Sequence, residues 1–186
     1  MKKIALLGFG VVGKGVYDII AKREDMEVPR VLVRRSIAEI AAISTDKIDD
    51  IVGDPAIDTV VEVMGGVHPA YEYISAALSA GKNVVTANKA VISACYKELT
   101  ALAAEKGVAL RCTAAVGGGI PWLINLERGR RIDTVTEGSG IMNGTTNYIM
   151  DAMHKSPVAF ADILKTPVCK ASRFTLTPNC AFFHIS

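Results

Sequence analysis

The stretch KIALLGFGVVGKGVYDII, residues 3–20, decides the fold that the sequence predicts. A short apolar run ends at Gly8, and Gly10 and Gly13 follow before a helical pattern begins. Between a strand and a helix, glycines at this spacing permit a tight turn, close approach of a pyrophosphate to the backbone, and close packing of helix on strand. The stretch therefore predicts a dinucleotide-binding unit. The alternative is a glycine-rich turn that holds no ligand.

The same alternation of apolar strand and helix continues along the chain. Strands are expected at residues 3–8, 28–33, 58–64, 82–87 and 108–116, and helices from the glycines to about 23, at 69–80 and at 89–106. Continuous apolar strands that alternate with helices favour a parallel sheet covered on both faces. The predicted class is α/β, a doubly wound parallel sheet of the Rossmann type.

A change of texture after Gly117, Gly118 and Gly119 predicts a second unit, the start of an α+β catalytic domain. A helix at 120–126, a strand at 134–143 and helices after residue 143 and at 160–165 are expected there. The predicted domains are residues 1–125 for NAD(P) binding and 126–165 for part of a catalytic, substrate-facing domain. Residues 166–186 have no helical period and are expected to be an aberrant tail.

Bulk composition excludes several classes of protein. The 186 residues are 50% hydrophobic with a formal net charge of +2, so neither nucleic acid nor a membrane is an expected partner. Glycines interrupt the N-terminal apolar run before it reaches the length of a signal peptide. The four cysteines and three histidines show no metal-ligand spacing. A cytoplasmic protein with reduced thiols is expected.

Two arginines bear on the choice of cofactor. Arg34 and Arg35 follow the second predicted strand about 20 residues after Gly13, where an acidic residue normally holds the ribose 2′-hydroxyl of NAD. Arginine at this place suits a 2′-phosphate, so NADP is favoured and NAD is the second choice. The alternative is a pair of solvated arginines at a strand end.

Further candidate residues lie at the ends of later strands. EVMGG at 62–66 and VVTANKAVIS at 84–93 place small or polar residues where ligands bind in open α/β sheets. Lys89 begins a helix, where a cation gains nothing from the dipole, so it is a candidate for binding an anion or for proton chemistry. The alternative is an ordinary surface lysine.

A polar run, GIMNGTTNYIM at 140–150, opens the helix of the second unit. Free backbone N–H groups at a helix start can hold a polar ligand. The alternative is a plain helix start with Asn143 or Thr145 as its N-cap.

Five motifs together resemble the homoserine dehydrogenase family: GFGVVG, VVEVMGG, GKNVVTANKA, AAVGGGIP and GIMNGTTNYIM, in the family's order and spacing. The resemblance implies reversible, NAD(P)-dependent interconversion of aspartate 4-semialdehyde and homoserine, a step of threonine and methionine biosynthesis. The expected partner is therefore a small amino-acid substrate, and a homo-oligomer is expected where the full catalytic domain is present.

The resemblance also assigns residues to roles. Expected cofactor-binding residues are Gly8, Phe9, Gly10, Val11, Val12, Gly13, Arg34, Arg35, Met64, Gly65, Thr86 and Lys89. Expected substrate-binding residues are Asn143, Gly144, Thr145 and Thr146. The catalytic lysine of the family belongs to the segment that is missing after Lys165, so Lys89, from its place at a helix start, is the candidate catalytic residue. Carbonyls of Val116, Gly118 and Ile120 are the expected ligands of a monovalent cation.

The sequence departs from the family in two places. Thr113 stands where family members usually carry the Glu that helps to hold the cation. After Lys165 the family's acidic, lysine-containing segment is missing, which predicts truncation or a shifted reading frame and impaired activity. Two alternatives stay open: a non-catalytic dinucleotide-binding fragment, and a semialdehyde dehydrogenase with Cys112 as nucleophile.

Overall fold

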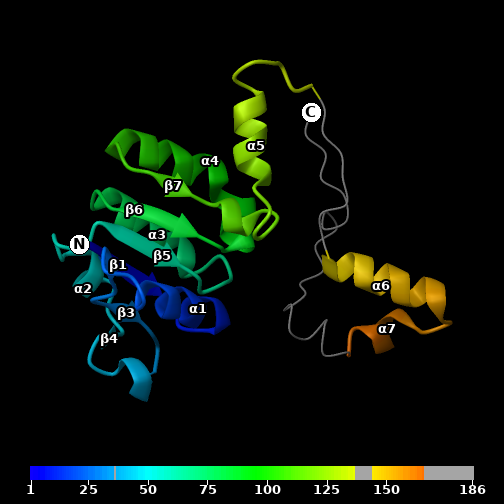
Figure 1. The fold of residues 1–186 in the computed structure, drawn as a ribbon, viewed down its shortest axis with the longest axis horizontal. Coiled ribbons are helices and arrows are strands. Elements are labelled where there is room, and N and C mark those ends of the chain that lie inside the picture. The colour runs from blue at the N-terminus through cyan, green and yellow to red at the C-terminus, as the bar shows by residue number, and fades with distance from the viewer. Residues whose placement is uncertain (36, 137–143, 166–186) are drawn as a thin grey trace. The chain divides into compact units, whose positions relative to one another are not determined.

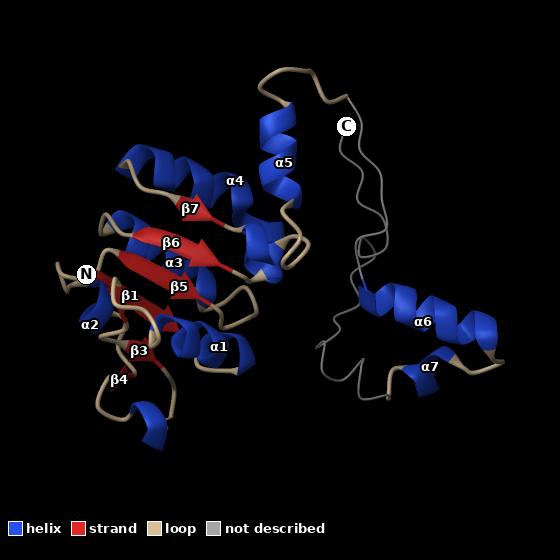
Figure 2. Ribbon diagram, in the orientation of Figure 1, coloured by secondary structure: helices blue, strands red, loops and turns tan. Residues whose placement is uncertain are grey.

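Strand β1 (Lys2–Leu7) lies at the centre of a parallel sheet in the computed structural model, which describes residues 1–35, 37–136 and 144–165 (Figure 1). The other strands are β2 (Met26–Glu27), β3 (Val31–Leu32), β4 (Ser44–Thr45), β5 (Thr59–Glu62), β6 (Asn83–Thr86) and β7 (Leu110–Arg111). Their order is β4-β3-β1-β5-β6-β7, with β2 also paired to β1 (Figure 2). All pairs are parallel, as the doubly wound prediction requires.

Helices cover both faces of the sheet because successive strand residues point to opposite sides. Leu6 packs with Ile20 at the end of α1, whereas Leu7 belongs to the cluster that contains Ile74 of α3 and Leu99 of α4. The helices of this unit are α1 (Val11–Ile20), α2 (Asp49–Val52), α3 (Ala70–Ser79) and α4 (Lys89–Lys106), with 3₁₀ turns η1 (Ala38–Ile40) and η2 (Thr113–Ala115). The sheet thus has a separate apolar core on each face.

Local chemistry explains how well the expected bounds hold. Helix α4 has the predicted limits because the Asn88 side chain accepts from the N–H groups of Ala90 and Val91, and Gly107 ends the helix at φ 67°. The strand expected at 28–33 shortens to β3, since Pro29 has no N–H to give to a ladder.

The strand expected at 108–116 is wrong over most of its length. Only β7 pairs with β6, and Cys112 then leaves the extended region, at φ −129° and ψ 17°, to begin η2. Among the described residues, strand β7 is the edge of the sheet, and no further strand there holds the chain extended. The apolar residues after it are therefore used in a turn.

The chain divides into two units, Met1–Leu123 and Ile124–Ser186. Helix α5 (Trp122–Gly129) contains the boundary, and the second unit holds α6 (Gly144–Lys155) and α7 (Phe160–Ile163), joined by contact of the buried Ile149 and Ile163. Residues 134–136 form no strand, and the rest of the strand expected at 134–143 lies outside the described residues, as does the expected tail at 166–186.

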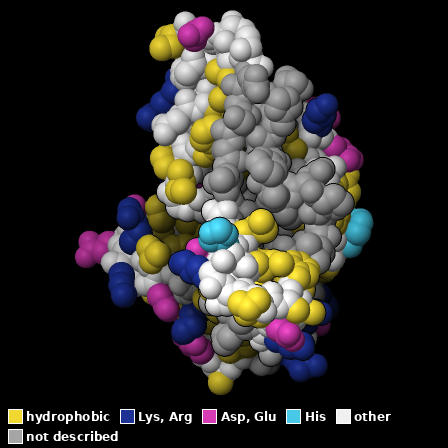
Figure 3. Space-filling model, turned by 90° about the vertical axis from the view of Figure 1, so that its right-hand side faces the viewer, with side chains coloured by type: hydrophobic (Ala, Val, Ile, Leu, Met, Phe, Trp, Pro, Cys, Tyr) yellow, Lys and Arg dark blue, Asp and Glu magenta, His cyan; other side chains and the backbone are white. Residues whose placement is uncertain are grey.

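The surface carries apolar side chains between charged ones (Figure 3). Tyr148, Met150 and Met153 on α6 are among the exposed large hydrophobic residues. Within the described ranges, no helix is both long enough and apolar enough to cross a membrane.

Candidate functional site

The carboxyl ends of β1, β3, β5 and β6 lie at one edge of the first unit, because these neighbouring strands are all parallel (Figure 2). The segments that leave this edge contain the glycine-rich turn, the two arginines, the Met64–Gly66 loop and the start of α4. Ligands bind at this edge in open α/β sheets. The topology thus gathers the predicted cofactor residues of the first unit at one candidate site.

The glycine-rich turn has the geometry that the sequence predicts. Gly8 adopts φ 102°, and its N–H donates to the carbonyl of Leu32 at 3.0 Å, which holds the turn against β3. A Cβ on Gly13 would lie 2.3 Å from the Gly8 carbonyl oxygen, so only glycine fits between helix and turn. A Cβ on Gly10 would meet nothing within 4 Å, which leaves the backbone there accessible.

The start of α1 offers free donors beside this turn. Gly10 is the N-cap and supplies no side-chain bond, and the first turn of α1 has no acidic residue. Val11 is 93% exposed. The first N–H groups of a helix lack intrahelical acceptors and carry the positive end of its dipole, so this start suits a phosphate.

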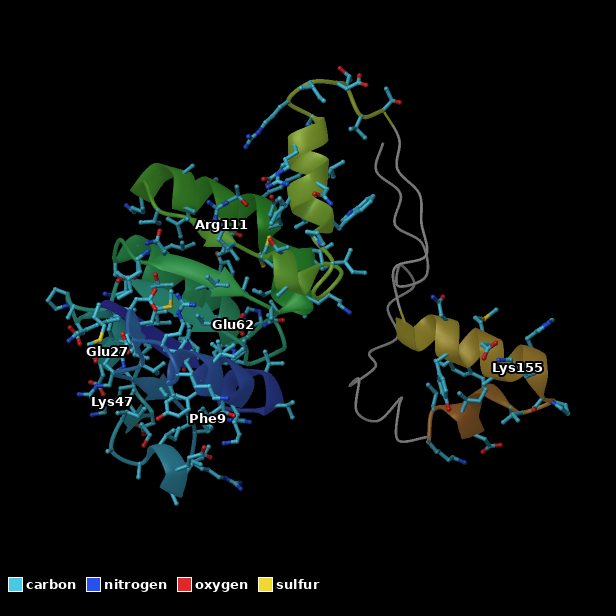
Figure 4. The ribbon with its side chains drawn as sticks, in the orientation of Figure 1. Phe9, Glu27, Lys47, Glu62, Arg111 and Lys155 are labelled. Carbon is cyan, nitrogen blue, oxygen red and sulfur yellow. The ribbon has the colours of Figure 1, made fainter. Side chains whose placement is uncertain are left out.

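Arg34 and Arg35 are exposed directly after β3. The segment that they begin is tied to α1, since the Lys14 ammonium donates to the carboxylate of Glu39 in η1. This bond raises the pKa of Lys14 above its ordinary value. The same ammonium lies 5.9 Å from the centre of the Phe9 ring in the glycine-rich turn (Figure 4). The cationic side chains of Lys14, Arg34 and Arg35 therefore lie on the side of the site that α1 and the segment after β3 form.

A buried hydrogen-bond network lies beneath the neighbouring strand ends. Glu62, the last residue of β5, is 0% exposed and accepts from the Met64 N–H at 2.8 Å and the Thr86 hydroxyl at 2.6 Å (Figure 4). The Asn88 amide donates to Glu62 at 3.2 Å and to the Gly66 carbonyl at 2.6 Å. The Asn88 N–H donates to Thr86 at 2.9 Å. The predicted cofactor residue Thr86 is thus buried within this network.

Other predicted residues lie above the network. Gly65 has φ 83°, and the Met64 Cγ lies 3.2 Å from the place of a Cβ on Gly8, so the Met64–Gly66 loop touches the glycine-rich turn. Lys89 is exposed as the first residue of α4. Sequence reasoning missed Glu62 and Asn88 as partners, although both stand inside the quoted motifs. The sequence signal that could have identified them is a charged or amide residue at the end of an apolar strand.

The expected cation ligands lie in the loop after η2. Gly118 adopts φ 61°, and the Ile120 carbonyl accepts from the Trp122 N–H at 2.8 Å. Over the described residues, no group of three or more His, Cys, Asp or Glu side chains is arranged to hold a metal ion. The expected ligands are backbone carbonyls and not such side chains, so the cation site with Val116 as third ligand stays a prediction.

The expected substrate residues belong to the second unit. Gly144, Thr145 and Thr146 form the first turn of α6, whereas Asn143 lies outside the described residues. Cys112, the nucleophile of one alternative, is buried at the start of η2.

Comparison with known proteins assigns the family. Residues 8–113 match the family model "Homoserine dehydrogenase, NAD binding domain", and residues 121–170 match the model "Homoserine dehydrogenase". Homoserine dehydrogenase of Bacillus subtilis is 37% identical over 177 residues, which cover 88% of this chain and 41% of the relative. The Lactococcus lactis enzyme is 39% identical, covering 81% of this chain and 39% of the relative. The chain thus spans about two fifths of these relatives.

Solved structures agree in fold. A homoserine dehydrogenase from Thiobacillus denitrificans has a TM-score of 0.78 at 35% identity, and the match covers 92% of this chain and 42% of the Thiobacillus chain. A hyperthermophilic archaeal homoserine dehydrogenase in complex with NADPH has a TM-score of 0.76 at 22% identity, covering 89% and 60% respectively, and shows the fold alone. The chain belongs to the homoserine dehydrogenase family of oxidoreductases, with the NAD-binding domain and part of the catalytic domain.

Proposed function

We propose that the carboxyl edge of the sheet binds NADP(H), with the pyrophosphate at the glycine-rich turn and the start of α1. The observation that carries this proposal is the geometry of the turn. Gly13 has no room for a side chain against Gly8, whereas the space at Gly10 is open. The turn therefore brings bare backbone and helix N–H groups to the place where an anion is held in this fold. Phe9, Val11 and Val12 flank the same backbone.

The preference for NADP over NAD follows from the charge beside the turn. Arg34 and Arg35 are exposed after β3, and guanidinium groups match the geometry of a phosphate. The Glu39 carboxylate in η1 is already paired with Lys14. The arginines then supply the contacts to the ribose 2′-phosphate.

The proposed reaction is the interconversion of aspartate 4-semialdehyde and homoserine. When bound, the nicotinamide cofactor supplies or accepts the hydride. Met64 and Gly65 orient it at the end of β5, and Thr86, buried at the end of β6, supports their loop through its bond to Glu62. Lys89, exposed at the start of α4, binds the substrate carboxylate or exchanges the proton of its hydroxyl group.

The second unit supplies proposed contacts to the amino-acid substrate. Residues 1–125 bind the cofactor and residues 126–165 belong to the catalytic domain, where Asn143, Gly144, Thr145 and Thr146 contact the amino-acid substrate. Carbonyls of Val116, Gly118 and Ile120 are the candidate ligands of a monovalent cation, with Thr113 in place of the Glu that family members usually carry there. The proposed setting is cytoplasmic amino-acid biosynthesis, with a homo-oligomer where the full catalytic domain is present.

Binding and turnover are tested separately, because the chain spans only 41% of the B. subtilis relative. NADPH and NADH are titrated by nicotinamide fluorescence, and turnover is measured as homoserine-dependent reduction of NADP⁺. Replacing Arg34 and Arg35 by Ala is expected to lower the NADPH-to-NADH affinity ratio by about tenfold or more, since a hydrogen bond to a charged group contributes about 1.5–3 kcal/mol.

Lys22→Ala, an exposed change just after the end of α1, is a control for the loss of positive charge away from the glycine-rich turn. An unchanged ratio in the double-arginine variant contradicts the 2′-phosphate assignment. NADPH binding without turnover supports a dinucleotide-binding role for this chain.

A further inference from the structure

Glu62 is a fully buried acid whose partners come from three segments of the chain. Its two carboxylate oxygens accept from the Met64 N–H, the Thr86 hydroxyl and the Asn88 amide, at 2.8, 2.6 and 3.2 Å. The first partner lies in the loop after β5, the second ends β6, and the third precedes α4. One side chain therefore joins the exits of two neighbouring strands.

The donors to Glu62 are all neutral, and no ion pair of this carboxylate is found among residues 1–35, 37–136 and 144–165. Burying an acid is costly unless hydrogen bonds replace its water, and an apolar residue of similar size often stabilises a fold equally well. What an apolar residue at this position could not do is orient the three donor groups that Glu62 binds.

The groups that Glu62 orients carry predicted cofactor residues. Its bond to the Met64 N–H fixes the loop in which Met64 contacts the glycine-rich turn. Its bond to Asn88 fixes the residue that caps α4 and that also binds the Gly66 carbonyl. Lys89 follows directly. Loss of the carboxylate would thus loosen the loop and the start of α4 together.

We propose that Glu62 is a positioning residue, which sets the Met64–Gly66 loop and Lys89 at the geometry that binds the cofactor. The inference rests on the proposed function, because it assumes that the cofactor occupies this edge. Glu62 itself is buried beneath the site and acts through Met64 and Asn88.

A matched control exists at the opposite end of the same strands. Lys82 is 4% exposed just before β6, and its ammonium donates to the carbonyls of Asp54 and Ile57, each at 2.7 Å. It is likewise a buried ionisable residue that joins the segments around β5 and β6. A structural defect alone is expected to act alike in variants of Lys82 and Glu62, whereas a defect of positioning acts only at Glu62.

The experiment compares Glu62→Gln, Lys82→Met, Lys89→Ala and the Glu62→Gln/Lys89→Ala double variant with the wild-type chain. Glutamine keeps the size but has one acceptor oxygen, so it cannot satisfy all the donors. Each protein is titrated with NADPH by fluorescence, and its folded fraction is taken from urea unfolding.

We expect Glu62→Gln to weaken NADPH binding about tenfold in the folded protein, and only about threefold on the Lys89→Ala background, because coupled residues are not additive. Lys82→Met is expected to lower stability and leave the affinity of the folded protein unchanged.

Three outcomes overturn one or both proposals. Wild-type affinity in folded Glu62→Gln, or fully multiplicative effects with Lys89→Ala, overturns the inference alone. A wild-type chain that binds no NADPH overturns the proposed function, and the inference with it. If Glu62→Gln does not fold, Asn88→Ser replaces it, since Ser keeps the cap but loses the amide donor, and the same affinities decide.

Discussion

Replacing Gly13 by Ala tests whether the close packing of α1 on the glycine-rich turn is what shapes the cofactor site. The new Cβ would lie 2.3 Å from the Gly8 carbonyl oxygen, whereas real Cβ atoms essentially never approach within 3.0 Å, so turn and helix must separate by about 0.7 Å. Overpacking of this kind costs about 1–3 kcal/mol of folding free energy. The neighbouring atom is backbone, so no side-chain rotation relieves the contact.

Movement of the turn also displaces the first N–H groups of α1. We expect the NADPH affinity of folded Gly13→Ala to fall about tenfold or more, equivalent to one lost charge-assisted hydrogen bond of about 1.5 kcal/mol. Urea unfolding gives the change in stability, and fluorescence titration gives the affinity.

Gly15→Ala, two residues further along the same helix, is the matched control. Gly15 is exposed, and a Cβ there would meet nothing within 4 Å. Alanine in an open helix position is expected to stabilise the protein by about 0.5–1 kcal/mol and to leave binding unchanged. Both variants gain the helix propensity of alanine, so they should differ by the overpacking cost of about 1–3 kcal/mol in stability. Equal stabilities, or wild-type NADPH affinity in Gly13→Ala, would refute the reasoning.

Two further predictions concern charged residues. Lys82→Met should destabilise the chain by about 1–3 kcal/mol at pH 7, because the part-buried Asp54 carbonyl and the buried Ile57 carbonyl lose their donor. Burial lowers the pKa of Lys82 below 10.5 in the folded protein, so the unfolded chain binds more protons as pH approaches that value. The stability of the wild-type chain relative to Lys82→Met is therefore expected to rise with pH in this range. Urea unfolding of both proteins across pH 8–10 measures the difference in their stability. If Lys82→Met gains on the wild-type chain as pH rises, the prediction is contradicted. Glu39→Gln removes a carboxylate from the segment after the arginines and should strengthen NADPH binding by about threefold or less at low salt, an effect that salt should screen. Titrations at two salt concentrations measure it, and weaker NADPH binding in Glu39→Gln would be the opposite of the expected result.

Much of the first unit could be predicted from local sequence signals. The glycine spacing after an apolar run predicts the strand, turn and helix around residues 3–20, and the structure gives Gly8 the positive φ and Gly13 the close contact that this reading requires. Helix α4 was predictable to the residue because Asn88 is a local start signal and Gly107 a local stop signal. A strand over this apolar run also places Leu6 and Leu7 on opposite faces, and the two side chains lie in opposite cores.

Only the tertiary structure decides which distant residues meet. Glu62 and Thr86 are 24 residues apart, and Lys14 and Glu39 are 25 apart, yet each pair is joined because parallel strands bring their exits to one edge. The strand expected at 108–116 failed for a related reason, since its apolar residues fit an edge turn as well as a strand. The periodicity of a sequence indicates which residues are buried. The identity of a hydrogen-bond partner depends instead on strand order and register, which only the packed sheet determines.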